Sequence, residues 1–523
     1  DVDAALAGVW DDGRRDALRG AYARSDLVYA EAAGARAIAA LDAYAEAWSA
    51  ASRAACEAAR DGDPEGLAQL RRRCLREART IVDARAQLLA TADDAVIDAT
   101  ERLVAGLRPL AECDDADLLR SELPLPADPL ERGAVDDLRR RLAAIDARLS
   151  AGQIELGLEQ VAAVLRDAEA TAYAPVLAEA TFREAALLRQ HQRFDDAEAA
   201  GLRAYGLAEE ADHRRLRAEI ANEMIYVAGR AGQENAATLW ATIAAALLRG
   251  LPRADALAAR YRRNLAAMRF FLGDFEAAAT EAAAAVEAAD AAFGPDHPEA
   301  LDVRSNYGAI LAVRGDDEGA LDVLGRALAD AERLHGATHP RIANILQNIS
   351  VSELSLKRYD DALGHVRRER AIREAVYGRD HANLFPSTCN LATTLISAGR
   401  VDEAAPELER CAALAARHFE PESRDAALVA MIQCSESEAR GRLDEAAERC
   451  QRGLALRSAI LGADHPETAQ SELRLADILA LQGRCDDAHA RWQAAEAVLR
   501  AKSPDRAPSP APKCVDAEPK RGR

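Results

Sequence analysis

The chain contains the stretch Gly294-Pro-Asp-His-Pro-Glu299, and copies of this stretch return at a fixed interval. They are Gly336-Ala-Thr-His-Pro-Arg341, Gly378-Arg-Asp-His-Ala-Asn383 and Gly462-Ala-Asp-His-Pro-Glu467, with a degenerate copy at Glu420-Pro-Glu422, all in register with a 42-residue period. Glycine favours the left-handed conformation that ends a helix, and proline is tolerated at the first position of the next. Each copy predicts a corner between two helices, and periodic corners predict a helical solenoid.

A second marker divides each repeat into a pair of helices. It is a turn residue, usually glycine, followed five residues later by a small residue. The positions are Gly152/Gly157, Gln192/Ala197, Gly232/Ala237, Gly273/Ala278, Gly315/Ala320, Lys357/Ala362, Gly399/Ala404, Gly441/Ala446 and Gly483/Ala488. The turn ends the first helix, and the small residue lets the second helix approach it closely. The sequence therefore predicts an all-α protein with nine helix pairs.

Within this pattern, several residues resemble the tetratricopeptide repeat in the 42-residue form seen in kinesin light chains. They are Asn306-Tyr-Gly308, Gly315, Ala320, Ala327 and the His-Pro corner. The resemblance implies a right-handed superhelix whose first helices line a concave groove that binds protein or peptide. We expect a helical N-terminal domain at 1–126, a tetratricopeptide solenoid at 127–500 and a disordered, Pro-rich basic tail at 501–523.

The N-terminal region reads as a long antiparallel helical hairpin. Helical runs at 27–60 and 65–107 are separated by the breaker Asp61-Gly-Asp-Pro64. Cys56 and Cys74 lie nearly symmetrically about this tip and are either buried thiols or a disulfide, and Cys514 has no visible partner. Nine cysteines without a Cys-x-x-Cys motif argue against a metal cluster, and their odd number favours a reducing compartment.

This N-terminal region carries a second resemblance. It is similar to the region after the catalytic domain in large serine/threonine protein kinases of myxobacteria and similar bacteria. The similar stretches are Leu6-Ala-Gly-Val-Trp10-Asp, Leu41-Asp-Ala-Tyr-Ala45-Glu-Ala-Trp48, Ala55-Cys-Glu57, Cys74-Leu75, Leu110-Ala-Glu-Cys113-Asp and Asp128-Pro129. The resemblance implies the sensor or docking half of a receptor-like kinase, or a stand-alone relative. Because the chain begins at Asp1 rather than methionine, we expect it to be a piece of a longer protein.

The sequence offers no catalytic machinery. It lacks the Gly-rich loop, the His-Arg-Asp loop and the Asp-Phe-Gly site of kinases, and the common hydrolase and metalloprotease motifs. We therefore predict no catalytic residues, no cofactor and no metal. His297, His339, His381 and His465 occupy successive corners, where capping of the next helix is favoured over metal binding, because ligands of one metal must converge.

The charge and hydropathy of the chain argue against several classes of binding partner. The formal net charge of -20 disfavours nucleic acid and anionic membrane surfaces, which require a basic face. No apolar run reaches the length of a membrane span, so we expect no direct membrane insertion of this chain. The expected location is cytoplasmic. The alternative is the extracytoplasmic half of a membrane-anchored kinase.

A row of asparagines is the candidate binding site. Asn264, Asn306, Asn348 and Asn390 are spaced by 42 residues, each at the sixth position of its repeat, and the row ends at the equivalents Ile432 and Arg474. By the tetratricopeptide resemblance, this position lines the groove and binds peptide backbone or a terminal carboxylate. A carboxamide offers donors and an acceptor to an extended peptide. The alternative is that the amides bond internally between repeats.

Two arginines extend this site. Arg260 and Arg263 share the repeat of Asn264 and add positive charge that suits an acidic peptide or a terminal carboxylate. The preferred function is a non-catalytic protein-binding scaffold, the regulatory or docking region of a bacterial serine/threonine kinase signalling protein. One alternative is a small-molecule sensor, which predicts a compact apolar pocket. The other is the C-terminal part of a longer catalytic kinase.

Overall fold

The computed structural model describes residues 3–60, 66–171, 173–502 and 509–514. Every regular element in these residues is an α-helix or a 3-10 helix, which confirms the all-α prediction. The chain divides into two compact units. Unit 1 consists of Asp1–Ile310 with Leu334–Gly336, and unit 2 consists of Leu311–Arg333 with Ala337–Arg523. No helix in the described residues is both long and apolar enough to cross a membrane.

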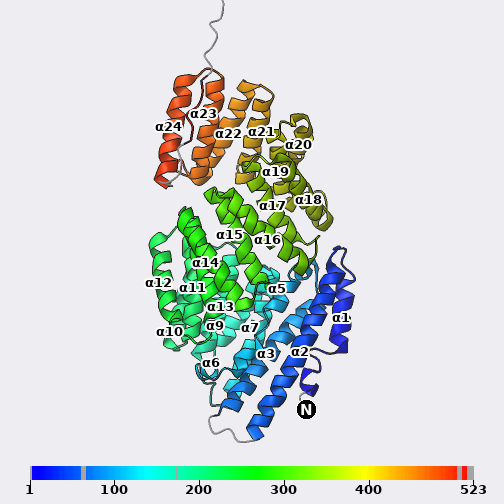
Figure 1. Cartoon of the computed structure of the whole chain (residues 1–523). Coiled ribbons are helices and arrows are strands. Elements are labelled where there is room, and N and C mark those ends of the chain that lie inside the picture. Colours follow the sequence, from blue (N-terminus) through cyan, green and yellow to red (C-terminus); the bar gives the residue numbers. More distant parts are fainter. Residues whose placement is uncertain (1–2, 61–65, 172, 503–508, 515–523) are drawn as a thin grey trace, which may run out of the picture. The chain divides into compact units, whose positions relative to one another are not determined.

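Unit 1 begins with a group of helices that lack the repeat. They are η1 (Asp3–Leu6), α1 (Asp12–Tyr22), α2 (Ala30–Arg60), α3 (Leu67–Ala90), α4 (Asp94–Asp98), α5 (Thr100–Ala105), η2 (Leu110–Asp114) and α6 (Ala116–Arg120). The long helices α2 and α3 pack together, and the indole of Trp48 on α2 donates a 2.7 Å hydrogen bond to the carbonyl of Leu75 on α3 (Figure 1). The breaker predicted at 61–64 lies outside the described residues.

The second helical run of this region is shorter than predicted. Helix α3 ends at Ala90 instead of continuing to Leu107. The reason is Asp93, whose carboxylate accepts a hydrogen bond from the amide of Val96 and thereby starts α4. An aspartate at this position satisfies an amide that a new helix would otherwise leave unpaired, so it favours a restart over continuation.

Nine helix pairs follow, as predicted. They are α7 (Pro129–Ala151) with α8 (Ile154–Glu169), α9 (Ala174–Gln190) with α10 (Phe194–Glu210), α11 (Arg214–Arg230) with α12 (Glu234–Leu248), α13 (Asp255–Phe271) with α14 (Phe275–Phe293), α15 (Pro298–Arg314) with α16 (Asp317–His335), α17 (Pro340–Ser355) with α18 (Tyr359–Tyr377), α19 (Phe385–Ser397) with α20 (Val401–His418), α21 (Arg424–Ala439) with α22 (Leu443–Leu461), and α23 (Pro466–Leu481) with α24 (Cys485–Lys502).

A turn ends the first helix of each pair at the predicted position, and the turn residue is in the left-handed conformation. The turn glycines have positive φ angles, and the two positions without glycine, Gln192 and Lys357, adopt the same conformation with φ angles of 62° and 61°. The small residue that follows is buried. In eight of the pairs this residue is an alanine that is 0% exposed, at positions 197, 237, 278, 320, 362, 404, 446 and 488. In the remaining pair the residue is Gly157 on α8, where an added Cβ atom would lie only 2.6 Å from Leu187 Cδ2 on α9. The α8 backbone therefore packs directly against the Leu187 side chain.

The corner histidines cap helices, which confirms the capping prediction. In each case Nδ1 accepts a hydrogen bond from the backbone amide two residues on, at 3.1–3.2 Å. The capping histidines are His297, His339, His381 and His465. The imidazole thus satisfies an amide of the first turn, which has no partner within the helix.

The predictions for Cys74 and Cys514 were wrong. Four disulfides form: Cys74–Cys113, Cys389–Cys411, Cys434–Cys450 and Cys485–Cys514. Cys56 stays a free, half-buried thiol, because Cys74 turns away from it towards η2, where the Cα of Cys113 lies 5.5 Å from its own. Cys514, expected to be a lone thiol of a disordered tail, is joined to α24; most of the tail lies outside the described residues.

We predict that the variant Cys434→Ala/Cys450→Ala lowers the thermal unfolding midpoint of the oxidised chain by several degrees. A disulfide contributes about 2–4 kcal/mol by restricting the unfolded chain. The matched control is Cys56→Ala, which removes a thiol that has no disulfide partner. Calorimetry would compare the variants. Equal shifts for both would contradict a stabilising role of the Cys434–Cys450 bond.

Candidate functional site

The first helices of the pairs form a common face in each unit, which we call the A-helix face. In unit 1, α9 and α13 both contact α11, and in unit 2, α17 and α21 both contact α19. All six predicted site residues lie on first helices. Arg260, Arg263 and Asn264 are on α13 and Asn306 is on α15, all in unit 1, whereas Asn348 and Asn390 are on α17 and α19 of unit 2.

Asn264 is an internal residue. Its side chain is 4% exposed, and its amide nitrogen donates to the carbonyl oxygen of Asn222 at 2.9 Å and to the side-chain oxygen of Asn222 at 3.2 Å. For this residue, the structure matches the alternative of internal bonding between repeats. Asn222 was missed as the partner because it lies one position out of register with its own turn.

The other three asparagines are available to a ligand. Asn306 is exposed, and Asn348 and Asn390 are half-buried. None of their side-chain amides forms a hydrogen bond with another residue in the described part of the chain; only the backbone carbonyl of Asn390 accepts one, from Thr394 Oγ1. An amide that is partly desolvated and unpaired gains from a polar ligand that completes its bonding.

Ion pairs neutralise most of the A-helix face of unit 1. Arg139 pairs with Glu179 at 2.8 Å and Arg183 with Asp146 at 3.1 Å, both between α7 and α9. Arg189 on α9 pairs with Glu223 on α11. Arg260 pairs with Glu299 through two hydrogen bonds, of 3.0 and 2.5 Å. The sequence did not reveal these pairs, because its many acidic residues allow too many combinations.

Arg263 differs from these arginines. It is half-buried and forms no hydrogen bond or ion pair within the described residues. Burial lowers the pKa of its guanidinium, as does the neighbouring Arg260, while Glu299 and Glu223 raise it. A partly desolvated guanidinium without a bonded anion is a strong donor site for a carboxylate. Arg263 therefore remains a candidate ligand-binding residue, whereas Arg260 is already paired.

Unit 2 contains an apolar cavity of about 660 Å³ on its A-helix face. Only the first helices α19, α21 and α23 line it, and its apolar walls include Ile396, Leu428, Met431, Ile432 and Leu481. At its edge Arg474 forms an ion pair with Glu438 and donates to Ser435 Oγ at 3.3 Å. Ile432 and Arg474 are the two positions at which the asparagine row ends.

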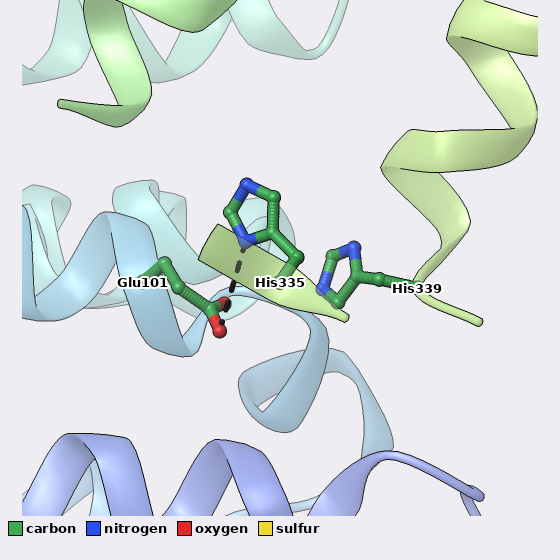
Figure 2. Close-up of side chains that lie close together, drawn as sticks. All are labelled: Glu101, His335 and His339. Carbon is green, nitrogen blue, oxygen red and sulfur yellow. Dashed lines mark ion pairs between the residues drawn. The ribbon is translucent and has the colours of Figure 1, made fainter. Parts of the chain in front are cut away.

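A further polar cluster in unit 1 surrounds the buried imidazole of His335. His335, the last residue of α16, is 1% exposed, and its Nδ1 lies 3.7 Å from Oε1 of Glu101 on α5. Figure 2 shows the imidazole beside this carboxylate. Arg36 on α2 donates to the same carboxylate oxygen at 2.7 Å and to the carbonyl of His335 at 3.4 Å. These contacts join the segment Leu334–Gly336 to α2 and α5 within unit 1.

The family described as tetratricopeptide repeat matches residues 255–332, 299–375, 348–417 and 437–501. The C-terminal half of the chain carries tetratricopeptide repeats. This finding confirms the resemblance for the second half of the chain; the matched family is a repeat family rather than an enzyme family. Among proteins of curated function, none is similar enough in sequence to match this chain.

Several solved structures resemble the chain. The apo form of RapI is 14% identical, covers 71% of this chain and 99% of its own, and has a TM-score of 0.52. A Rap protein complexed with competence and sporulation factor has a TM-score of 0.50 at 14% identity and covers 71% of this chain and 100% of its own. Kinesin light chain repeats of Podosopora anserina are 19% identical over 40% of this chain and 99% of theirs, with a TM-score of 0.32. The Rap likenesses show the fold.

We predict that two asparagine variants differ in their effect on the free energy of unfolding. Asn264→Ala should lower the free energy of unfolding by about 1–3 kcal/mol, because it leaves the buried amide oxygen of Asn222 without its donor. Asn306→Ala removes an exposed, unpaired amide and should change it by less than about 0.5 kcal/mol. Urea unfolding measures both. Equal losses would contradict the distinction between the internal and the available amides.

Proposed function

We propose that the chain is a non-catalytic scaffold that binds an extended peptide segment of a partner protein on its A-helix face. The observation that carries this proposal is the set of unpaired amides of Asn306, Asn348 and Asn390, which recur at one repeat position. A carboxamide pairs with both the amide and the carbonyl of an extended backbone. In unit 1, Arg263 adds a cation that suits a side-chain or terminal carboxylate.

The fold likeness is consistent with this proposal. One of the similar Rap structures is a complex with competence and sporulation factor, so a solenoid of comparable fold holds a ligand in that protein. We further propose that the scaffold serves as the regulatory or docking region of a bacterial serine/threonine kinase signalling protein. This context rests on the sequence resemblance of the N-terminal region alone.

The disulfides bear on the compartment. Four disulfides are typical of proteins that fold in an oxidising environment, whereas cytosolic thiols are kept reduced. We therefore favour the extracytoplasmic alternative over the cytoplasmic location expected from the odd cysteine number. In that setting the scaffold would dock or sense a ligand outside the cytoplasm on behalf of a kinase.

The test of peptide binding uses a phage-displayed library of random peptides, selected on the oxidised full chain. We predict that Asn348→Ala/Asn390→Ala weakens the peptides that bind unit 2 by about 30-fold, because each amide contributes about 1 kcal/mol through its hydrogen bonds. The control is Asn235→Ala, an exposed asparagine on the second helix α12. Fluorescence anisotropy measures the affinities. Recovered peptides that bind the double variant and wild type equally would contradict the proposal for unit 2.

Arg263 is tested through the charge of the peptide. For peptides that unit 1 binds through a carboxylate, Arg263→Gln should reduce affinity by about 10- to 100-fold, since a charge-assisted hydrogen bond contributes about 1.5–3 kcal/mol. Arg262→Gln is the matched control, because the neighbouring Arg262 is exposed and paired with Glu281. Amidation of the peptide carboxylate should remove the difference between wild type and Arg263→Gln. A difference that persists would exclude the assigned contact.

A further inference from the structure

The asparagine row and the apolar cavity of unit 2 meet on one helix. Asn390 lies on α19, and Thr393 and Ser397 of the cavity wall follow it by three and seven residues on the same helix. Residues at these spacings lie on one face of a helix. A peptide whose backbone contacts the amide of Asn390 therefore runs towards the mouth of the cavity.

The cavity suits an uncharged, apolar occupant. Leu428, Met431 and Ile432 form its wall on α21, and Leu481 on α23 is 39% exposed at its side. The two charged residues of the lining, Glu438 and Arg474, neutralise each other through their ion pair. An added charge would have no partner there and would lose its hydration. Where the row of amides ends, the face changes from polar to apolar.

The size of the cavity indicates more than one side chain. A volume of about 660 Å³ lies within the range of pockets that hold a whole drug-sized molecule. In an extended peptide, residues i and i+2 point to the same side, about 7 Å apart. Two apolar side chains separated by one residue therefore use the cavity while the backbone continues along the A-helix face.

Disulfides hold the helix pairs around the cavity. Cys389–Cys411 joins α19 to α20, and Cys434–Cys450 joins α21 to α22. The third pair carries Cys485–Cys514, which ties the segment after α24 to that helix. In the described residues, the six earlier pairs have no disulfide. A cavity with rigid walls loses less conformational entropy when a ligand binds. The disulfides lie in the helix pairs that form the cavity, where this rigidity favours binding.

We propose that this cavity is the anchor site for an apolar-x-apolar motif in the peptide whose backbone Asn348 and Asn390 hold. The inference rests on the proposed function and adds the side-chain class that the ligand must carry. The competing occupant is a free apolar small molecule, which the sensor alternative predicts.

The experiment blocks the cavity with a bulky side chain introduced at its rim. Ser397 is exposed and lines the cavity, so Ser397→Trp adds bulk there without removing a core residue. Ser355 on α17 occupies the same register position one repeat earlier, is exposed and does not line the cavity, so Ser355→Trp is the matched control. Peptides selected on the oxidised full chain should share an apolar-x-apolar motif. Ser397→Trp should weaken them at least 10-fold and Ser355→Trp less than 2-fold, with unchanged circular dichroism for both.

A second variant covers the case in which Ser397→Trp fails to fold. Leu481→Ser removes a partly exposed apolar group of the lining and should weaken the same peptides by about 5-fold. Selected peptides that depend on Asn348 and Asn390, yet share no apolar motif and tolerate the cavity variants, would overturn this inference and leave the proposed function standing.

The absence of any selected peptide would overturn both. In that case the uncharged dye Nile red identifies the remaining occupant, because dye binding that Ser397→Trp removes and Ser355→Trp preserves assigns the cavity to a small apolar molecule.

Discussion

The contact on which the repeats depend is the close approach of two helices through a small, fully buried residue. Eight alanines, all 0% exposed, and the buried Gly157 occupy this position, each five residues after a turn in the left-handed conformation. A larger side chain would push the helices apart and change the angle at which successive pairs stack. Within each unit, first helices of neighbouring pairs contact one another, and residues at one repeat position share one face.

That shared face has different chemistry in the two units. In unit 1, charged side chains of this face form ion pairs such as Arg139–Glu179 and Arg260–Glu299. The amide of Asn264 donates a hydrogen bond to Asn222. In unit 2 the charges at the cavity cancel in one pair, and the surrounding side chains are apolar. Within the described residues, the Arg263 guanidinium and the amides of three asparagines form no hydrogen bond with another side chain, so they can bind a polar ligand without breaking an internal bond.

Sequence predicted the features that depend on neighbours along the chain. The nine pairs, their turns at Gln192 and Lys357 and the histidine caps all follow from residues a few positions apart. The features that depend on how each helix is rotated about its axis were not predictable in this way. Cys74 pairs with Cys113 rather than with the thiol beyond the hairpin tip, and Asn264 turns inward although Asn306 at the same repeat position does not.

The cavity shows the same limit of sequence reasoning. Ile432 and Arg474 were recognised only as the points where the asparagine row ends. That they line a hollow requires side chains from three helices to diverge around it, and residues as far apart as Thr393 and Leu481 contribute. An apolar pocket, which the sensor alternative predicts, therefore occurs in the same unit as Asn348 and Asn390, the last two amides of the row that the peptide scaffold predicts.

Hydrogen–deuterium exchange of the oxidised full chain, with and without a selected peptide, tests the central claim most directly. The account predicts slower exchange in the first helices α17, α19, α21 and α23 when the peptide is bound, because ligand contacts oppose local opening of the helices they touch. The second helices α18, α20 and α22 should change less. Protection concentrated on the second helices, or on the N-terminal helices α1 to α3, would contradict binding on the A-helix face.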